Sequence, residues 1–242
     1  MSVKTVAWFS AGVSSAVATK LAISEIDEVF YIHIADQHPD TLRFVRDCEA
    51  WFKKPITILQ SPYKCVSTAV KAAGGNGWIN GVGGAACTRR LKKFVRAEWE
   101  QSQLGISAIR YVWGMDNDET HRAERIRETM HELEHRFPLI ERGIGKAEAH
   151  EILRASGIKR PAMYELGYHN NNCVGCVKGG MGYWNKIRVD FPDVFASRAK
   201  LEREVGGSCI KGVYLDELVP DRGRHDGPIC DDCGIMCELQ KI

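Results

Sequence analysis

Short apolar runs, each followed by a polar loop and most by a helix-forming stretch, constrain the fold of this chain most. Four runs have the length and composition of buried strands, namely Thr5–Phe9, Val29–Ile34, Ile56–Leu59 and Ile109–Trp113. Helices are expected after three of them, over residues 16–24, about 40–52 and about 118–135. Strand, loop and helix repeated in this order indicate a parallel sheet with helices on both faces. We therefore predict a doubly wound α/β fold.

Length and charge narrow the class of protein. The chain has 242 residues, of which 33 are basic and 31 acidic, and a net charge of +2 favours neither a nucleic-acid coat nor a membrane surface. No apolar run approaches the roughly 20 residues of a spanning helix, and the N-terminal run is too short for a signal peptide. We expect a cytoplasmic protein with no membrane partner. Residues 1–160 are predicted to form the α/β domain, and residues 161–242 a cysteine-rich, loop-dominated region that completes the site.

The nine cysteines are too dilute for a disulfide scaffold, but six of them fall into three groups. These are a lone Cys87, a CxxC at Cys173 and Cys176, and a CxxCxxxC at Cys230, Cys233 and Cys237. Thiolates at CxxC spacing are typical ligands of a soft metal or an iron–sulfur cluster. A four-cysteine zinc site built from the two CxxC pairs is an alternative.

The segment Ser10–Ser15 lies between the first strand and the first helix. Backbone N–H groups and the positive end of the helix dipole converge there, which favours an anion. Gly12 permits close approach of a ligand, and Ser10, Ser14 and Ser15 add hydroxyl donors. The segment is neither a GxGxxG nor a GK[ST] loop, and a plain turn with serine caps is the alternative.

This loop resembles the SGGxDS motif of the PP-loop (adenine nucleotide α-hydrolase) superfamily, and the chain is most similar to the phosphoadenosine phosphosulfate (PAPS) reductase family within it. Further similar segments follow in the family's order: Asp36–Thr41 (DTG…ET), Cys87–Lys93 (CCxxRK), Gly114–Arg122 (a polar turn), Phe137–Ile140 (a PL element) and Gly167–Cys176 (GY…C..C). The resemblance covers roughly residues 5–190.

The resemblance implies an adenine nucleotide site for PAPS, adenosine phosphosulfate (APS) or ATP. The loop residues Ser10, Gly12, Ser14 and Ser15 would hold the phosphate end, with Asp36 near the ribose or adenine. Arg89 and Lys92 would bind a phosphate or sulfate, since such cations suit oxyanions.

The resemblance also implies a [4Fe–4S] cluster held by Cys87, Cys173 and Cys176. The family's CC pair is reduced here to Cys87 and Thr88, so the fourth ligand is absent from that segment. Either a tail cysteine, Cys230, supplies it, or the fourth iron stays open. Zinc remains the alternative metal.

The tail segment around Cys233 is similar to the catalytic ECGxH segment of PAPS reductases. Cys233 would then be the nucleophile, although its neighbours Cys230 and Cys237 make ligation an equal alternative. Either role requires the tail to fold back over the strand ends.

The function implied is reduction of a sulfonucleotide to sulfite, with a thiol or ferredoxin-like electron donor. Ser14 stands where ATP-splitting relatives have an aspartate, which suits nucleotide binding without α–β cleavage. Two alternatives remain: ATP-dependent sulfur insertion into a nucleic acid, and a nucleotide-binding regulator with a structural zinc.

A further motif, His131-Glu-Leu-Glu-His135, matches the HExxH pattern of metalloproteases. The helix expected over about residues 118–135 would turn both histidines toward solvent, opposite its apolar stripe. We therefore do not expect a zinc site there.

Overall fold

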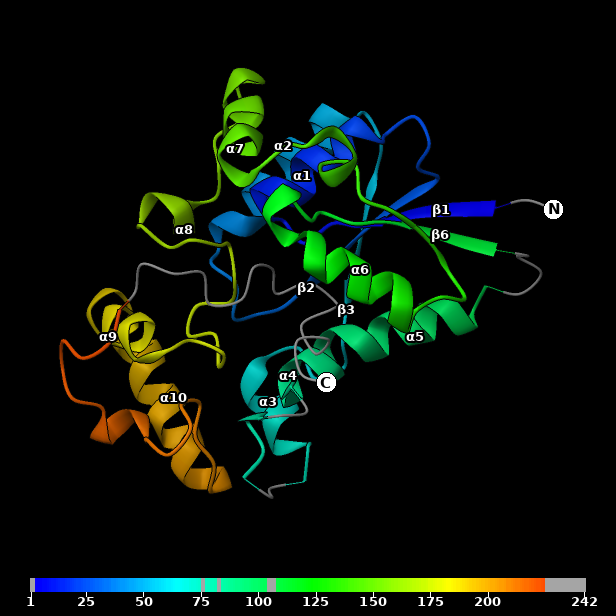
Figure 1. Ribbon diagram of the computed structural model, residues 1–242. Coiled ribbons are helices and arrows are strands. Elements are labelled where there is room, and N and C mark those ends of the chain that lie inside the picture. Colours follow the sequence, from blue (N-terminus) through cyan, green and yellow to red (C-terminus); the bar gives the residue numbers. More distant parts are fainter. Residues whose placement is uncertain (1–2, 75–76, 82–83, 104–107, 225–242) are drawn as a thin grey trace. The chain divides into compact units, whose positions relative to one another are not determined.

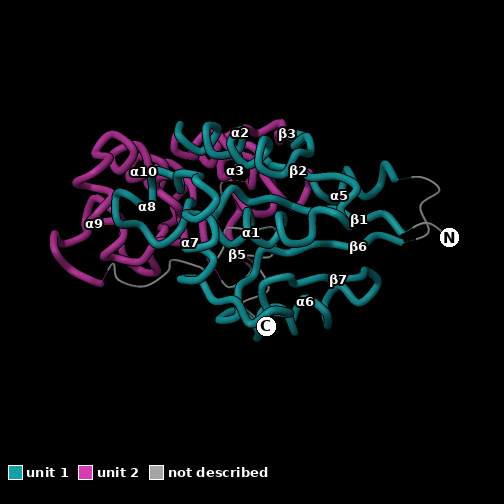
Figure 2. Tube along the Cα trace, turned by 90° about the horizontal axis from the view of Figure 1, so that it is seen from above, with its two compact units in different colours: residues 1–32, 39–59, 96–171 teal, residues 33–38, 60–95, 172–242 magenta. Residues whose placement is uncertain are grey.

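The computed structural model describes residues 3–74, 77–81, 84–103 and 108–224 (Figure 1). The chain divides into two compact units (Figure 2). Unit 1 comprises residues 1–32, 39–59 and 96–171, and unit 2 comprises residues 33–38, 60–95 and 172–242. Each unit is built from separate stretches of chain, so residues far apart in the sequence meet within it.

A five-stranded sheet forms the centre of unit 1. Its strands are β1 (Val3–Trp8), β2 (Glu28–His33), β3 (Ile56–Gln60), β6 (Ala108–Val112) and β7 (Glu134–Arg136). Their order is β3-β2-β1-β6-β7, and β1 pairs in parallel with both β2 and β6, as β6 does with β7. The predicted α/β fold is confirmed. The chain runs outward from β1 to β3 and then returns to β6, so the strand order reverses between β1 and β6, where ligands bind in open α/β sheets.

Helices cover both faces of this sheet (Figure 1). The elements are α1 (Val13–Leu21), α2 (Asp40–Phe52), α5 (Phe94–Gln101), η2 (Asn117–Glu119), α6 (Thr120–Thr129), η3 (Ile140–Arg142), α7 (Lys146–Ala155) and α8 (Ala162–Glu165). Alternate strand residues face opposite layers. Ala7 and Phe9 join the core formed with α1, α2 and α7, whereas Trp8 packs edge-on against Trp99 of α5, with 5.6 Å between ring centroids.

The helix predicted to reach residue 135 ends at Thr129, and β7 follows it. This corrects the expectation for the HExxH motif: His131 is exposed after the helix, and His135 lies in β7. Trp113 Nε1 donates to His135 Nδ1 over 3.1 Å, and His135 Nε2 is 2.8 Å from the Met130 carbonyl oxygen. With its two histidines off a common helix face, the motif does not form the metalloprotease arrangement.

Unit 2 is mainly helical. Its elements are α3 (Val66–Lys71), β4 (Asn80–Gly81), β5 (Gly84–Ala85), α4 (Ala86–Thr88), the π-helix η1 (Arg89–Lys93), α9 (Met181–Asp190), α10 (Pro192–Val205) and η4 (Leu215–Glu217). The buried Glu202 of α10 accepts the backbone N–H groups of Cys209 and Leu215, which fixes the chain after the helix. In the described part of the chain, every helix is too short or too polar to span a bilayer.

Candidate functional site

The turn between β1 and α1 holds a strained residue. Ala11 is fully buried and has a φ of 60°, in the left-handed region that favours glycine. Its carbonyl oxygen accepts a 2.8 Å hydrogen bond from the side-chain amide of Asn171, which follows α8 in the chain. Residues over-determined in this way are common at ligand sites.

The predicted hydroxyl donors of this loop are engaged with one another. Ser15 Oγ accepts the Gly12 N–H over 3.2 Å and the hydroxyl of Ser10 over 2.9 Å. Ser14 Oγ donates to Asp116 Oδ2 over 3.1 Å. The predicted loop residues therefore lie close together, as a shared site requires: Ser10, Gly12, Ser14 and Ser15. Ser14 and Ser15 are buried.

Asp116 brings a carboxylate to the loop from the end of β6, across the point where the strand order reverses. Gly114 makes this approach possible, because a Cβ there would lie 2.4 Å from the Ser15 Cα. Burial raises the pKa of Asp116, and the hydrogen bond from Ser14 partly opposes that rise. Position 14 has a serine in place of an aspartate, but the carboxylate of Asp116 lies beside it. The sequence alone does not show this contact.

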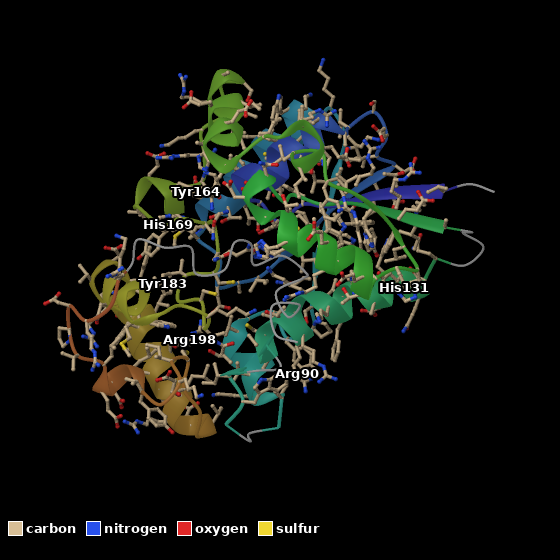
Figure 3. The ribbon with its side chains drawn as sticks, viewed as in Figure 1. Arg90, His131, Tyr164, His169, Tyr183 and Arg198 are labelled. Atoms are coloured by element: carbon tan, nitrogen blue, oxygen red, sulfur yellow. The ribbon has the colours of Figure 1, made fainter. Side chains whose placement is uncertain are left out.

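Tyr164 of α8 also reaches the start of α1. Its hydroxyl oxygen accepts the Val13 N–H over 3.3 Å, so one amide at the positive end of the helix dipole already has a partner. Figure 3 labels this tyrosine on α8.

In unit 2, the three cysteines predicted as ligands line one cavity of about 10 Å³, roughly the size of one water molecule. Cys87 is half-buried, and Cys173 and Cys176 are buried. The cavity is also lined by Ile34, Val66, Thr88, Leu91, Lys92 and Val177. Among the described residues none of these three cysteines forms a disulfide.

The turn of the CxxC is fixed from two sides. Gly175 has a φ of 68°, and the Tyr183 hydroxyl accepts the Cys176 N–H over 2.9 Å and donates to the Cys173 carbonyl over 3.3 Å. On the other side, Gln37 and Cys173 form an antiparallel bridge, and the Val174 N–H donates to the Asp36 carbonyl over 2.8 Å. The segment after β2 therefore positions the thiols.

Asp36 has both carboxylate oxygens engaged within unit 2. Oδ2 accepts the Val66 N–H at the start of α3 over 2.7 Å, and Oδ1 pairs with Arg198 over 2.8 Å. Arg198 lies on α10, is almost fully buried, and also contacts the Ser67 hydroxyl (Figure 3). Burial lowers the pKa of Arg198, but the charge and hydrogen bond of Asp36, together with the nearby Cys209 and Cys87, raise it by more, so the net pKa is raised. Its Nε has no hydrogen-bond partner among the described residues.

Sequence reasoning missed Arg198, although a signal was present. Arg198, Leu201 and Val205 follow the spacing of one helical face, and all three are buried. A charged residue on an apolar stripe needs a partner, which here is Asp36.

The two predicted oxyanion binders differ in position. Lys92 lines the cysteine cavity, whereas Arg89 is exposed, with its guanidinium 5.6 Å from the ring centroid of Phe94. Both lie in the π-helix η1, a distortion that is frequent at functional sites. Cys230 and Cys233 lie outside the described residues.

The thiols fit a soft metal in kind and in shared location, since cysteine thiolates are the ligands of iron–sulfur clusters. Within the described residues, no three His, Cys, Asp or Glu side chains are already arranged around a metal position. Binding a cluster therefore requires these thiols to turn toward a common centre and the cavity to widen.

Comparison with protein families gives one match. Residues 4–179 match the family described as the phosphoadenosine phosphosulfate reductase domain, which is well over half of the 242 residues. The chain belongs to the phosphoadenosine phosphosulfate reductase family. The predicted PP-loop membership is thereby confirmed. A comparison with curated proteins finds no match.

The phosphoadenosine phosphosulfate reductase domain includes the Ser10–Ser15 loop and the three cysteines of the cavity, and it ends before Arg198. An enzyme of the sulfonucleotide reductase type or a related type is thus indicated by the family. The elements α9 and α10 lie beyond the matched residues and belong to unit 2.

Proposed function

We propose that this chain is a sulfonucleotide reductase that binds an adenine nucleotide at the Ser10–Ser15 loop and carries out sulfur chemistry with the cysteines of unit 2. One observation supports the proposal most. Cys87 and Cys173 are 173 − 87 = 86 residues apart, yet both line one cavity with Cys176 and Lys92. A structural role alone gives no reason for a cation beside three clustered thiols.

The phosphate end of the nucleotide is assigned to the N-terminus of α1, where backbone N–H groups and the helix dipole favour an anion. Gly12→Val crowds the backbone that faces the phosphate, and we expect it to weaken adenine nucleotide binding while the fold is kept. Asp36 is assigned to the ribose or adenine: its carboxylate oxygens accept from Val66 and pair with Arg198, and each oxygen has a further lone pair for a nucleotide donor. Unchanged affinity for PAPS, APS and ATP in Gly12→Val would contradict the placement.

Cys87, Cys173 and Cys176 would hold a [4Fe–4S] cluster, with Cys230 of the tail as the fourth ligand. When bound, such a cluster supplies a redox-active, sulfur-binding centre whose potential depends on burial and hydrogen bonding. Lys92 places a positive charge beside the same thiols, where it would offset part of the negative charge of the bound thiolates.

The chemical step is assigned to Cys233. Its thiolate attacks the sulfur of the sulfonucleotide, an S–S bond forms, and the S–O bond breaks, so that the nucleotide phosphate leaves with the bonding electrons. A thiolate of a dithiol donor then attacks Cys233 Sγ and releases sulfite. The second thiol of the donor resolves the mixed disulfide and is oxidised to the donor's disulfide.

Experiments with anaerobically purified protein test both the reduction and the cluster. With PAPS or APS and a dithiol, we expect release of sulfite and an iron content that Cys173→Ser and Cys176→Ser abolish. Cys65→Ser is the matched control, because Cys65 lies at the start of α3 and outside the cysteine cavity. Full zinc occupancy without iron, in protein from iron-replete cells, would contradict the cluster.

The role of the tail is tested separately. Cys233→Ser should keep the cluster and lose turnover, whereas Cys230→Ser should lose the cluster. Deletion of residues 229–242 without any change in metal content or activity would contradict both assignments.

ATP-dependent sulfur insertion into a nucleic acid remains a second candidate, and the Ser14–Asp116 contact favours it. Asp116 has its carboxylate beside Ser14, the position at which ATP-splitting relatives have an aspartate. Release of AMP and pyrophosphate from ATP, lost in Asp116→Asn, would support this candidate over reduction. Nucleotide binding without any turnover would instead support a regulatory protein with a structural zinc.

A further inference from the structure

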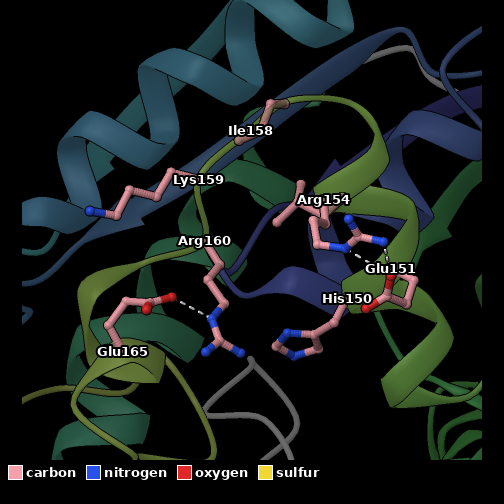
Figure 4. Close-up of a pocket in the computed structure, with 8 residues that line it drawn as sticks. His150, Glu151, Arg154, Ile158, Lys159, Arg160 and Glu165 are labelled. Atoms are coloured by element: carbon pink, nitrogen blue, oxygen red, sulfur yellow. Dashed lines mark hydrogen bonds and ion pairs between the residues drawn. The ribbon is translucent and has the colours of Figure 1, made fainter.

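Unit 1 contains a second cavity, of about 430 Å³, formed by α7, the segment that follows it and α8 (Figure 4). This volume is typical of small-molecule sites. The buried Leu153 and the half-buried Ile158 give it an apolar wall. None of the residues proposed above for nucleotide or sulfur chemistry lines it.

The remaining lining is charged, with more cations than anions. Arg154, Lys159 and Arg160 face two acids, Glu151 and Glu165. Both acids are neutralised within the cavity, since Glu151 pairs with Arg154 over 2.5 Å and Glu165 with Arg160 over 2.6 Å (Figure 4). The lining therefore carries a net positive charge and favours an anion.

The backbone that presents two of these cations is held in place. Arg43 of α2 donates to the carbonyl oxygen of Lys159 over 2.8 Å and to that of Arg160 over 3.2 Å. Asp40 accepts the Ala162 N–H over 2.8 Å just beyond them. The two cations thus stand on a pre-organised segment, which lowers the entropic cost of binding.

His150 completes the lining beside the cations. Its ring packs edge-on against Tyr164, with 4.9 Å between centroids. Burial lowers the pKa of His150, and the charges of Arg160 and Lys146 lower it further, so the imidazole senses the positive field of this region.

We propose that this cavity binds a small organic phosphate, a ligand separate from the nucleotide of the Ser10–Ser15 loop. Lys159 and the guanidinium groups of Arg154 and Arg160 would hold the phosphate, because the planar guanidinium suits two of its oxygens. Leu153 and Ile158 would contact the organic part. The volume exceeds the need of inorganic phosphate, which assigns the site to a phosphomonoester.

Calorimetric titration of the full chain with phenyl phosphate tests the proposal. The double variant Lys159→Glu/Arg160→Glu should weaken binding by about tenfold or more, since charge-assisted hydrogen bonds are lost. Glu165→Gln should tighten binding, because it frees Arg160 from its ion pair, and such a gain is not explained by misfolding. Arg203→Glu is the matched control: Arg203 is similarly exposed and paired with Asp216 in unit 2, so binding should not change.

Four outcomes would overturn the proposal. The first is absence of binding by the unaltered chain, and the second is equal binding by the double variant. The third is loss of phenyl phosphate binding in Gly12→Val, which would place the phosphate at the loop. The fourth is inorganic phosphate binding as tightly as phenyl phosphate, which would remove the role of the apolar wall.

Discussion

Ala11 has a strained backbone conformation at the turn between β1 and α1. Its φ of 60° costs an L-residue about 1–2 kcal/mol. Ala11→Gly should therefore stabilise the chain by up to about 1 kcal/mol in urea unfolding, after the larger backbone entropy of glycine is subtracted. Ala16→Gly is the control, because Ala16 is buried within α1 and should lose about 1 kcal/mol. Equal destabilisation by both changes would contradict strain at Ala11.

Asp116 gives a pH-dependent prediction. Burial raises its pKa in the folded state, so its contribution to stability is present at low pH and is lost as the pH rises through the folded pKa. Asp116→Asn keeps an acceptor for Ser14 and removes the buried charge. The variant should gain stability relative to the unaltered chain as the pH rises from about 4 to 7. Unfolding curves across this range provide the measurement, and a difference that does not vary with pH would contradict the assignment.

At the scale of residues, the sequence located the loop but not its contacts. The serines of Ser10–Ser15 were predicted as donors to a ligand, and the structure engages them with one another and with Asp116. Asp36 pairs with Arg198, a partner that the sequence did not indicate, and its place near the ribose or adenine stays a prediction. The partner of a polar side chain can come from a distant segment, as Asp116 does, 102 positions after Ser14, and no local pattern encodes that.

Among the elements, the turn of the CxxC gives the sharpest prediction. A Cβ on Gly175 would lie 2.7 Å from Val194 Cγ1, at a φ of 68°. Gly175→Ala should cost about 1–3 kcal/mol and speed alkylation of Cys173 and Cys176. Gly180→Ala is the control, because no atom lies within 4 Å of the added Cβ. Its effect should stay below about 1 kcal/mol, because only the preference of the α9 N-cap for glycine over alanine is lost.

Element types followed from the sequence where the hydrophobic pattern was long. β1, β2, β3, β6 and the helix α2 lie within two or three residues of their predicted bounds. β7 was missed because three residues are too few to show a period, and its edge position is defined by pairing with β6. Because residues 134–136 pair with β6, α6 ends at Thr129 and not at residue 135. His131 and His135 therefore do not share a helix face.

At the scale of the molecule, unit 2 depends on residues outside the family match. Tyr183 and Arg198 both follow position 179 and hold the CxxC turn and Asp36. A chain ending at residue 179 leaves Asp36 without its counter-charge, and loss of one partner of a buried pair costs about 3–5 kcal/mol. We expect hydrogen exchange and thiol alkylation to show unit 2 unprotected, whereas a chain ending at residue 224 stays protected. Equal protection of the metal-free chains would contradict this dependence.

The bridge between Gln37 and Cys173 cannot form during synthesis until Cys173 has been translated. Its two residues are 173 − 37 = 136 positions apart, so the segment after β2 leaves the ribosome long before its partner exists. At about 5–20 residues per second, the interval between translation of Cys87 and Cys173 is about 4–17 s. For that time Cys87 lacks the other two cysteines of the cavity, whose lining is complete only after Val177 has been translated.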